Sequence, residues 1–205
     1  MKRLMLLFLT CVLVLSSFSL CFAEAAVEEE NHVVTIERTQ DELDAIHEKN
    51  LENALRKMQC KDQVMSKGSK AGFDDGEYRT VWSSPKRTKL SGFCGNQPPE
   101  GTRFQSSGGF YISKTGGPSC STSVKFSAPF KGATITIDLG KVKSGGGVYV
   151  NAPDTKHYFK AKCTKEFEVK SYIVYRKPSP NEAEYVYTRG TSEALKKEDY
   201  VAVRV

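Results

Sequence analysis

The chain has 205 residues, a net charge of +6 and six cysteines, none of which form a Cys-x-x-Cys pair. The absence of that spacing argues against a redox centre and against a zinc knuckle. About 180 residues remain once a predicted leader is removed, and this length fits one compact domain with an appendage.

The charge is distributed unevenly along the sequence. Residues 24–59 contain ten acidic and four basic residues, whereas residues 60–205 contain 14 acidic and 24 basic residues. An acidic N-terminal segment therefore precedes a basic body, and a basic surface favours anionic partners.

Residues 1–25 have the pattern of a secretory signal peptide. Lys2 and Arg3 precede an apolar stretch over residues 4–20, and small residues follow it. This order predicts cleavage and export. A membrane anchor is the alternative, because the apolar stretch approaches the length that spans a bilayer. A lipid anchor at Cys21 is disfavoured by the bulky residue before it. We expect a secreted, extracellular or wall-associated protein without membrane contact after cleavage.

Four cysteines remain after cleavage, and an even number in an exported chain predicts two disulfides with three possible connectivities. Cys120 and Cys163 both share the alternation of apolar residues on their predicted strands, so we predict that they face one core and pair. Cys60 would then pair with Cys94.

A helix is predicted over residues 39–67, between an acidic flexible lead-in at 26–38 and a linker loop at 68–77. The lead-in contains a few β-branched residues that would form a short edge strand at most. Thr39 and Glu42 have the spacing of a capping box. Apolar residues follow on one helical face, which would pack on a sheet or self-associate: Leu43, Ile46, Leu51, Leu55 and Met58.

Residues 78–205 are predicted to form an antiparallel β-sandwich or a barrel-like domain. Short alternating segments are separated by Gly- and Pro-rich turns, with no helical segment between them. Residues 191–199 are interpreted as one helical turn before a closing strand. The predicted strands are 78–83, 102–105, 110–113, 121–127, 133–139, 148–152, 157–164, 167–176, 184–188 and 200–205.

The run from 157 to 176 organises this domain, because its odd positions are mostly apolar and its even positions mostly charged. Such alternation predicts one face on a core and one face in water. A usual strand has about 5–6 residues. We therefore expect the run to bend or split near Lys165 or Ser171, where the apolar face is interrupted.

The even positions of this run are the predicted binding site. Long cationic side chains beside aromatic rings can neutralise charge and stack on a ligand at once, so an anionic wall polymer or a glycan is the expected partner. The site residues are Tyr158, Lys160, Lys162, Lys170 and Tyr172.

No catalytic constellation is recognised, and we expect that the protein is not an enzyme. A triad would need His157 with Asp154 or Asp138 and a nucleophile such as Ser119 or Ser121, but no nucleophile elbow is present. Glu166 and Glu168 are interpreted as a surface salt-bridge ladder rather than a glycosidase pair. No metal, cofactor or nucleic acid is expected. A secreted toxin or membrane-active protein and a cell-wall hydrolase are the alternative functions.

Four short segments resemble a group of uncharacterised small secreted proteins of clostridia-like bacteria. They are Gly95-Asn96-Gln97-Pro98, Gly108-Gly109-Phe110-Tyr111, Pro129-Phe130 and Tyr158-Phe159-Lys160. The resemblance covers residues 92–177 and implies bacterial export and a β-rich domain. It transfers no active-site residues. The four cysteines of the mature chain depart from the group and are interpreted as a local stabilising device.

Overall fold

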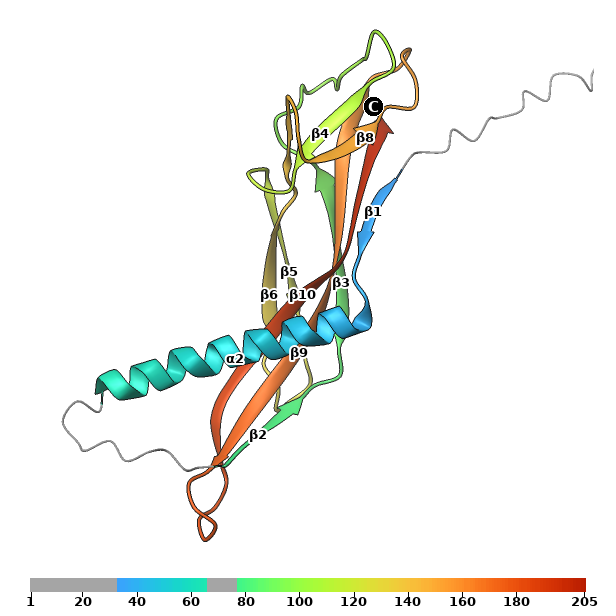
Figure 1. The fold of residues 1–205 in the computed structure, drawn as a ribbon. Coiled ribbons are helices and arrows are strands. Elements are labelled where there is room, and N and C mark those ends of the chain that lie inside the picture. Colours follow the sequence, from blue (N-terminus) through green and yellow to red (C-terminus); the bar gives the residue numbers. More distant parts are fainter. Residues whose placement is uncertain (1–32, 66–76) are drawn as a thin grey trace, which may run out of the picture. The chain divides into compact units, whose positions relative to one another are not determined.

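The computed structural model describes residues 33–65 and 77–205, and the side chains of all of these except 60–65. The predicted signal peptide and residues 68–76 of the predicted linker at 68–77 lie outside the described residues, as does the side chain of Cys60. The last residue of that linker, Glu77, begins a strand. Within the described part the protein is mainly β, with antiparallel sheets and one helix (Figure 1). The predicted fold class is therefore confirmed.

Helix α2 spans Gln40–Met65 and begins at the predicted capping box. The backbone N–H of Thr39 donates to Glu42 Oε2 at 2.8 Å, and the N–H of Glu42 donates to Thr39 Oγ1 at 3.3 Å. These bonds satisfy two N–H groups that have no partner within the helix. The short strand β1, Val34–Glu37, precedes α2 and lies at an edge of the largest sheet. Residues 34–37 are therefore not the flexible lead-in predicted for 26–38, but the short edge strand that was the alternative.

The largest sheet is built around strand β9, Phe159–Lys177, which pairs along nearly its whole length with β10, Tyr185–Arg204. β1 adds to the free edge of β10. The other edge of β9 is shared by β2, Glu77–Trp82, and β3, Lys86–Phe93. β3 pairs with residues 162–169 and β2 with residues 172–177, so the partner changes at the two residues between them.

The predicted split of the long run is wrong, because β9 is continuous from Phe159 to Lys177. The interruption near Ser171 marks the change of partner from β3 to β2 instead. Lys165 is buried on the core side, where its ammonium donates to the carbonyl of Asp138 at 2.7 Å and lies 3.5 Å from Glu198. The irregular pairing lies in β10, whose register with β9 shifts at two places, between Val186 and Thr188 and between Leu195 and Lys197. The predicted helical turn at 191–199 is also wrong, since these residues belong to β10.

Two smaller sheets complete the β domain. β4 (Gly109–Ser113) lies between β7 (Lys141–Lys143) and β8 (Val148–Asn151), and β5 (Ser119–Val124) pairs with β6 (Ala133–Asp138). Of the predicted strand at 102–105, only Thr102 forms an isolated bridge, to Phe159. All three sheets contribute to one buried cluster, which gives a sandwich-like arrangement. Its largest fully buried members are Phe159, Ile112, Ile135, Val150, Val169 and Tyr200.

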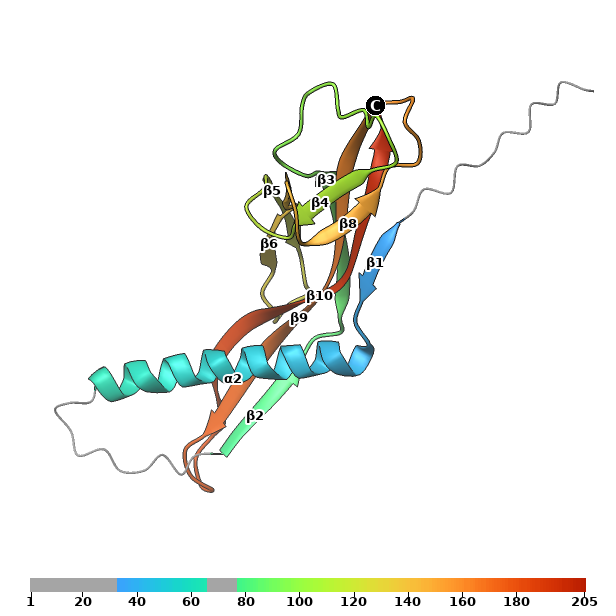
Figure 2. The ribbon, with the colours of Figure 1, turned by 45° about the horizontal axis from the view of Figure 1, so that its top comes forward.

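Helix α2 crosses the β9–β10 pair (Figures 1 and 2). A second buried cluster lies at this crossing, formed by Leu51 of α2 with Tyr172 and Val174 of β9. The helix thus covers the even-numbered face of β9 in its C-terminal half. The apolar stripe of α2 packs on the sheet, one of the two roles that the sequence left open.

The described cysteines are free thiols, and the predicted Cys120–Cys163 disulfide is not formed. The alternation was interpreted correctly for Cys163, which is fully buried in the main cluster that Cys120 borders. However, the alternation shows only which side of its strand a cysteine faces. It does not show which other cysteine lies across the core from it. Cys94, which comes directly after β3, is in the same cluster. Burial raises the pKa of Cys94 to about 12 and that of Cys163 to about 11.

These thiols are expected to be unreactive in the folded protein, because the thiolate is the reacting form and burial disfavours it. Iodoacetamide at pH 8, without reductant, should leave Cys94 and Cys163 unmodified in the native protein and modify both in urea. Peptide mass spectrometry measures this. Labelling of the native protein would contradict their burial, and protection that persists in urea would show that they are oxidised.

Candidate functional site

The structure separates the five predicted binding residues into two groups. Tyr158 is 45% exposed, and Lys160 and Lys162 are partly exposed on the face of β9 opposite the main core. The residues that alternate with them, Phe159, Ala161 and Cys163, are at most 1% exposed. In this half of β9 the predicted alternation of buried and accessible side chains is confirmed.

A phenylalanine that the sequence analysis did not include completes this surface. Phe93 of β3 is directly opposite Lys162 in register and is 46% exposed. The ammonium of Lys160 lies 5.6 Å from the centre of the Phe93 ring, within the range of a cation–π contact. Neither lysine forms an ion pair within the part of the chain that the structure describes. We call Phe93, Tyr158, Lys160 and Lys162 the Lys160 face.

Lys170 and Tyr172 do not belong to the Lys160 face, and their predicted solvent exposure is wrong. The side chain of Lys170 is 17% exposed and its ammonium is 2.6 Å from Asp44 Oδ1 of α2. Tyr172 is 6% exposed and its ring is 5.3 Å from that of Trp82. The cause is α2, which covers this part of the strand. Alternation within one strand identifies its two faces but does not show that a distant helix covers the second.

A buried polar cluster lies under the helix at this point. His47 of α2, Glu168 of β9 and Ser192 of β10 are 1%, 1% and 3% exposed. His47 Nδ1 is 2.8 Å from Ser192 Oγ, and His47 Nε2 is 3.7 Å from Glu168 Oε1. The interpretation of Glu168 as a member of a solvated ladder is therefore wrong, because α2 removes it from water. His47 falls within the predicted helix at 39–67, but its partners on β9 and β10 are more than a hundred residues away and no local pattern identifies them.

Other polar groups converge on the same cluster. The amide of Gln40 donates to Glu168 Oε1 at 3.2 Å, and the Nδ2 of Asn50 donates to Ser192 Oγ at 3.0 Å. The ammonium of Lys170 lies 3.6 Å from Glu168. Arg87 Nε lies 3.8 Å from Glu168 Oε2, at ion-pair distance, but His47 Nε2 and Glu168 Oε2 are buried without a hydrogen-bond partner. Such groups cost free energy unless they are paired, so this cluster stabilises the helix less than its number of polar groups indicates.

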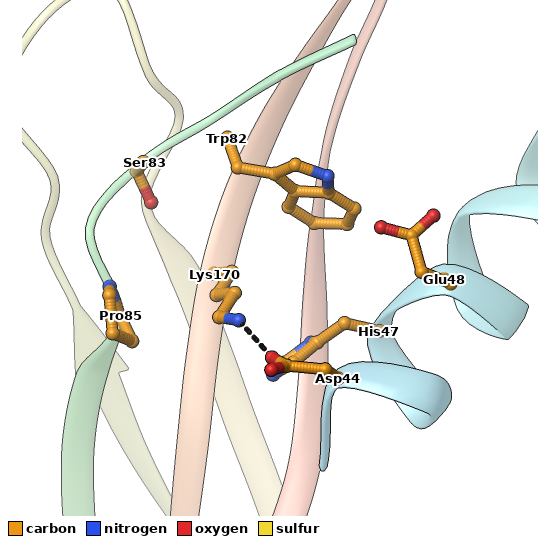
Figure 3. A pocket seen from close by; sticks show the side chains of 7 residues that line it. All are labelled: Asp44, His47, Glu48, Trp82, Ser83, Pro85 and Lys170. Atoms are coloured by element: carbon orange, nitrogen blue, oxygen red, sulfur yellow. Dashed lines mark hydrogen bonds and ion pairs between the residues drawn. The ribbon is translucent and has the colours of Figure 1, made fainter. Parts of the chain in front are cut away.

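A pocket of about 190 Å³ opens beside the cluster, between α2 and the segment that follows β2 (Figure 3). The ring of Trp82 lies on one side, and the ion pair of Asp44 and Lys170 lies beside His47 on another. Its remaining lining residues are Glu48, Ser83 and Pro85.

Serine, histidine and glutamate are the residue types of a nucleophile, base and acid, but their placement here serves packing. Ser192 does not line the pocket and is nearly inaccessible, so its hydroxyl cannot meet a substrate unless α2 moves. The hydrogen bonds of the cluster join α2 to β9 and β10, and they fix the position of the helix on the sheet.

The other histidine arrangement considered from the sequence is only partly assembled. His157 Nδ1 lies 2.6 Å from Asp154 Oδ2, and Asp154 also accepts two backbone N–H groups of the same loop. These bonds lower the pKa of Asp154, the side-chain contact with His157 most of all. Asp138 instead accepts backbone N–H groups of three glycines. Ser121 is hydrogen-bonded to Thr136 rather than to His157.

The described residues form neither a metal-binding cluster nor a membrane-spanning helix. Within residues 33–65 and 77–205, no group of three or more His, Cys, Asp and Glu side chains is arranged to hold a metal ion. The helix in this part of the chain is not both long and apolar enough to cross a membrane. Comparisons with family models, curated proteins and solved structures found no match.

The position of His47 predicts a pH-dependent stability. Burial lowers the pKa of His47, and the charge of Lys170 lowers it further. The unfolded chain, with an ordinary histidine pKa of about 6.5, therefore binds a proton more readily than the folded chain. Stability is full above that pH and declines as the pH falls below it, by at most about 1.4 kcal/mol per pH unit.

Urea unfolding at pH 8 and at pH 5.5 tests this, with His47→Gln as the comparison. The wild type should lose more stability between the two pH values than the variant does. The pKa of Asp44 is lowered by its hydrogen bond with Lys170, so Asp44 titrates below this range and does not confound the result. Equal losses in the two proteins would contradict the burial of a neutral His47.

Proposed function

We propose that the protein is secreted and that it binds an anionic cell-wall polymer or acidic glycan, without catalysis, through the Lys160 face. The observation that carries this proposal is the pair of lysines on one strand face that form no ion pair with the described residues, beside two exposed aromatic rings. Three other lysines of β9 and β10 are already paired: Lys165 with Glu198, Lys170 with Asp44 and Lys196 with Glu166.

The rigidity of the strand supports this role. Lys160 and Lys162 sit between residues buried in the main core, and they pair across the ladder with Val203 and Val201 of β10. A fixed backbone holds the two ammonium groups on the same side, so little ordering is required when a polyanion binds. The interaction is expected to weaken steeply with salt, because the Debye length is about 8 Å at physiological ionic strength.

The test is retention on insoluble cell-wall sacs that carry their anionic polymers, as salt is increased. Replacing both lysines (Lys160→Gln with Lys162→Gln) should weaken binding by about two- to thirtyfold, if each exposed contact contributes about 0.2–1 kcal/mol. The thermal midpoint should be nearly unchanged, because both side chains project away from the core.

The matched control is Lys125→Gln with Lys131→Gln, which removes the same charge from two exposed lysines of the β5–β6 turn. This control should bind like the wild type. Equal weakening in both variants would show that net charge alone drives retention, and unaltered retention without Lys160 and Lys162 would refute the Lys160 face as the site.

A further inference from the structure

A second exposed aromatic and basic surface lies on the sheet of β7, β4 and β8. Tyr111 of β4 and Tyr149 of β8 face each other directly in register, with ring centres 4.8 Å apart and planes inclined by 49°. They are 39% and 43% exposed. Two adjacent rings are therefore held together at the surface, where aromatic groups are more often found at binding sites than left to water.

The sheet beneath these rings is anchored to the core. Phe110, Ile112 and Val150 alternate with the two tyrosines along β4 and β8, and they are at most 3% exposed in the main cluster. The tyrosines must therefore point to the opposite face. Their positions depend on a buried backbone and not on a loop.

Two lysines share this face. Lys143 of β7 is opposite Tyr111 on the other side from Tyr149, so Lys143, Tyr111 and Tyr149 form one row across three strands. Lys141 is two residues before Lys143, on the same face of β7, and is opposite Ser113 of β4. The three strands contain no acidic residue, and neither lysine forms an ion pair with any residue that the structure describes. The charge of this face is therefore uncompensated and positive.

The loop at residues 144–147 makes this row possible. β7 and β8 are consecutive in sequence but lie on opposite sides of β4, so the loop must cross the end of β4. Gly147 has a φ of +98°, and a Cβ there would be 2.3 Å from the carbonyl oxygen of Ile112. Only glycine permits so close a crossing, and the crossing places Lys143 and Tyr149 on either side of Tyr111.

We propose that Tyr111, Lys141, Lys143 and Tyr149, which we call the tyrosine face, bind an acidic polysaccharide whose sugar rings carry carboxylates. The apolar faces of sugar rings stack on the tyrosines, and the lysines neutralise the carboxylates beside them. A single-stranded nucleic acid also stacks on aromatic rings, but it requires a groove of cations that follows its backbone. This face carries two lysines. No residue is shared with the Lys160 face, so either surface can bind without the other.

Three probes separate the two contributions in calorimetric titrations of the full chain. Polygalacturonate carries rings and charge, dextran carries rings without charge, and polyphosphate carries charge without rings. Tyr111→Thr with Tyr149→Thr should weaken polygalacturonate binding about tenfold and leave polyphosphate binding unchanged. Lys141→Gln with Lys143→Gln should weaken the binding of both polyanions. Dextran should bind the wild type more weakly than polygalacturonate does, because it has no carboxylates for the lysines to neutralise.

The variant with Lys125 and Lys131 replaced by glutamine is the control, and the variant with Lys160 and Lys162 replaced by glutamine measures the separate contribution of the Lys160 face. Loss of polygalacturonate binding only on replacement of Lys160 and Lys162 would overturn the tyrosine face and leave the Lys160 face standing. Tighter binding of oligo(dT) than of polygalacturonate, lost in the tyrosine variant, would overturn the assignment of a polysaccharide. If the threonine variant does not fold, ring proton signals decide: those of Tyr111 and Tyr149 should shift with polygalacturonate in the wild type, and unshifted signals would refute the proposal.

Discussion

The antiparallel ladder between β9 and β10 is the interaction on which the rest of the structure depends. It joins Phe159–Lys177 to Tyr185–Arg204 over nearly their full length. Every other part of the largest sheet adds to an edge of this pair. The main cluster packs on one face of its first half, and α2 packs on the opposite face of its second half. One strand thus passes through two environments, and its even-numbered residues change from accessible to buried along its length.

This change of environment explains where polar groups are buried. Glu168 and Lys170 continue the alternation that exposes Lys160 and Lys162, yet α2 lies over them. A buried carboxylate without enough partners is costly, and His47, Gln40 and Lys170 approach it for that reason. The polar cluster is the consequence of docking a helix on a strand face that retains charged residues. The proposed binding surfaces lie where no described element covers the sheet.

Local patterns predicted the parts of the fold that depend on neighbouring residues. The capping box placed the start of α2, and the alternation in residues 159–163 identified the core side of β9. The same alternation placed Lys160 and Lys162 on the accessible side. β3 was missed because Lys86, Arg87 and Lys89 leave Leu90 as one of only two large apolar residues, so no apolar face is visible. Phe93 was missed with it as a neighbour of the lysines.

The burial of Lys170 and Tyr172 could not be predicted in the same way, since it depends on a contact between α2 and a strand more than a hundred residues away. Gly190 of β10 contributes to it, because a Cβ there would be 2.3 Å from the hydroxyl oxygen of Tyr172. The row of Lys143, Tyr111 and Tyr149 also required the structure, since the crossing loop decides which strands are neighbours. Residue types pointed to basic and aromatic surfaces, and strand order decided which residues form them.

The central claim is that β9 is accessible on its even-numbered face in the first half and covered by α2 in the second. Brief acetylation of lysines in the native protein, followed by peptide mass spectrometry, tests this claim within one strand. The account predicts rapid modification of Lys160 and Lys162 and slow modification of Lys170, with the difference abolished in urea. Modification of Lys170 at the rate of Lys160 in the folded protein would contradict it.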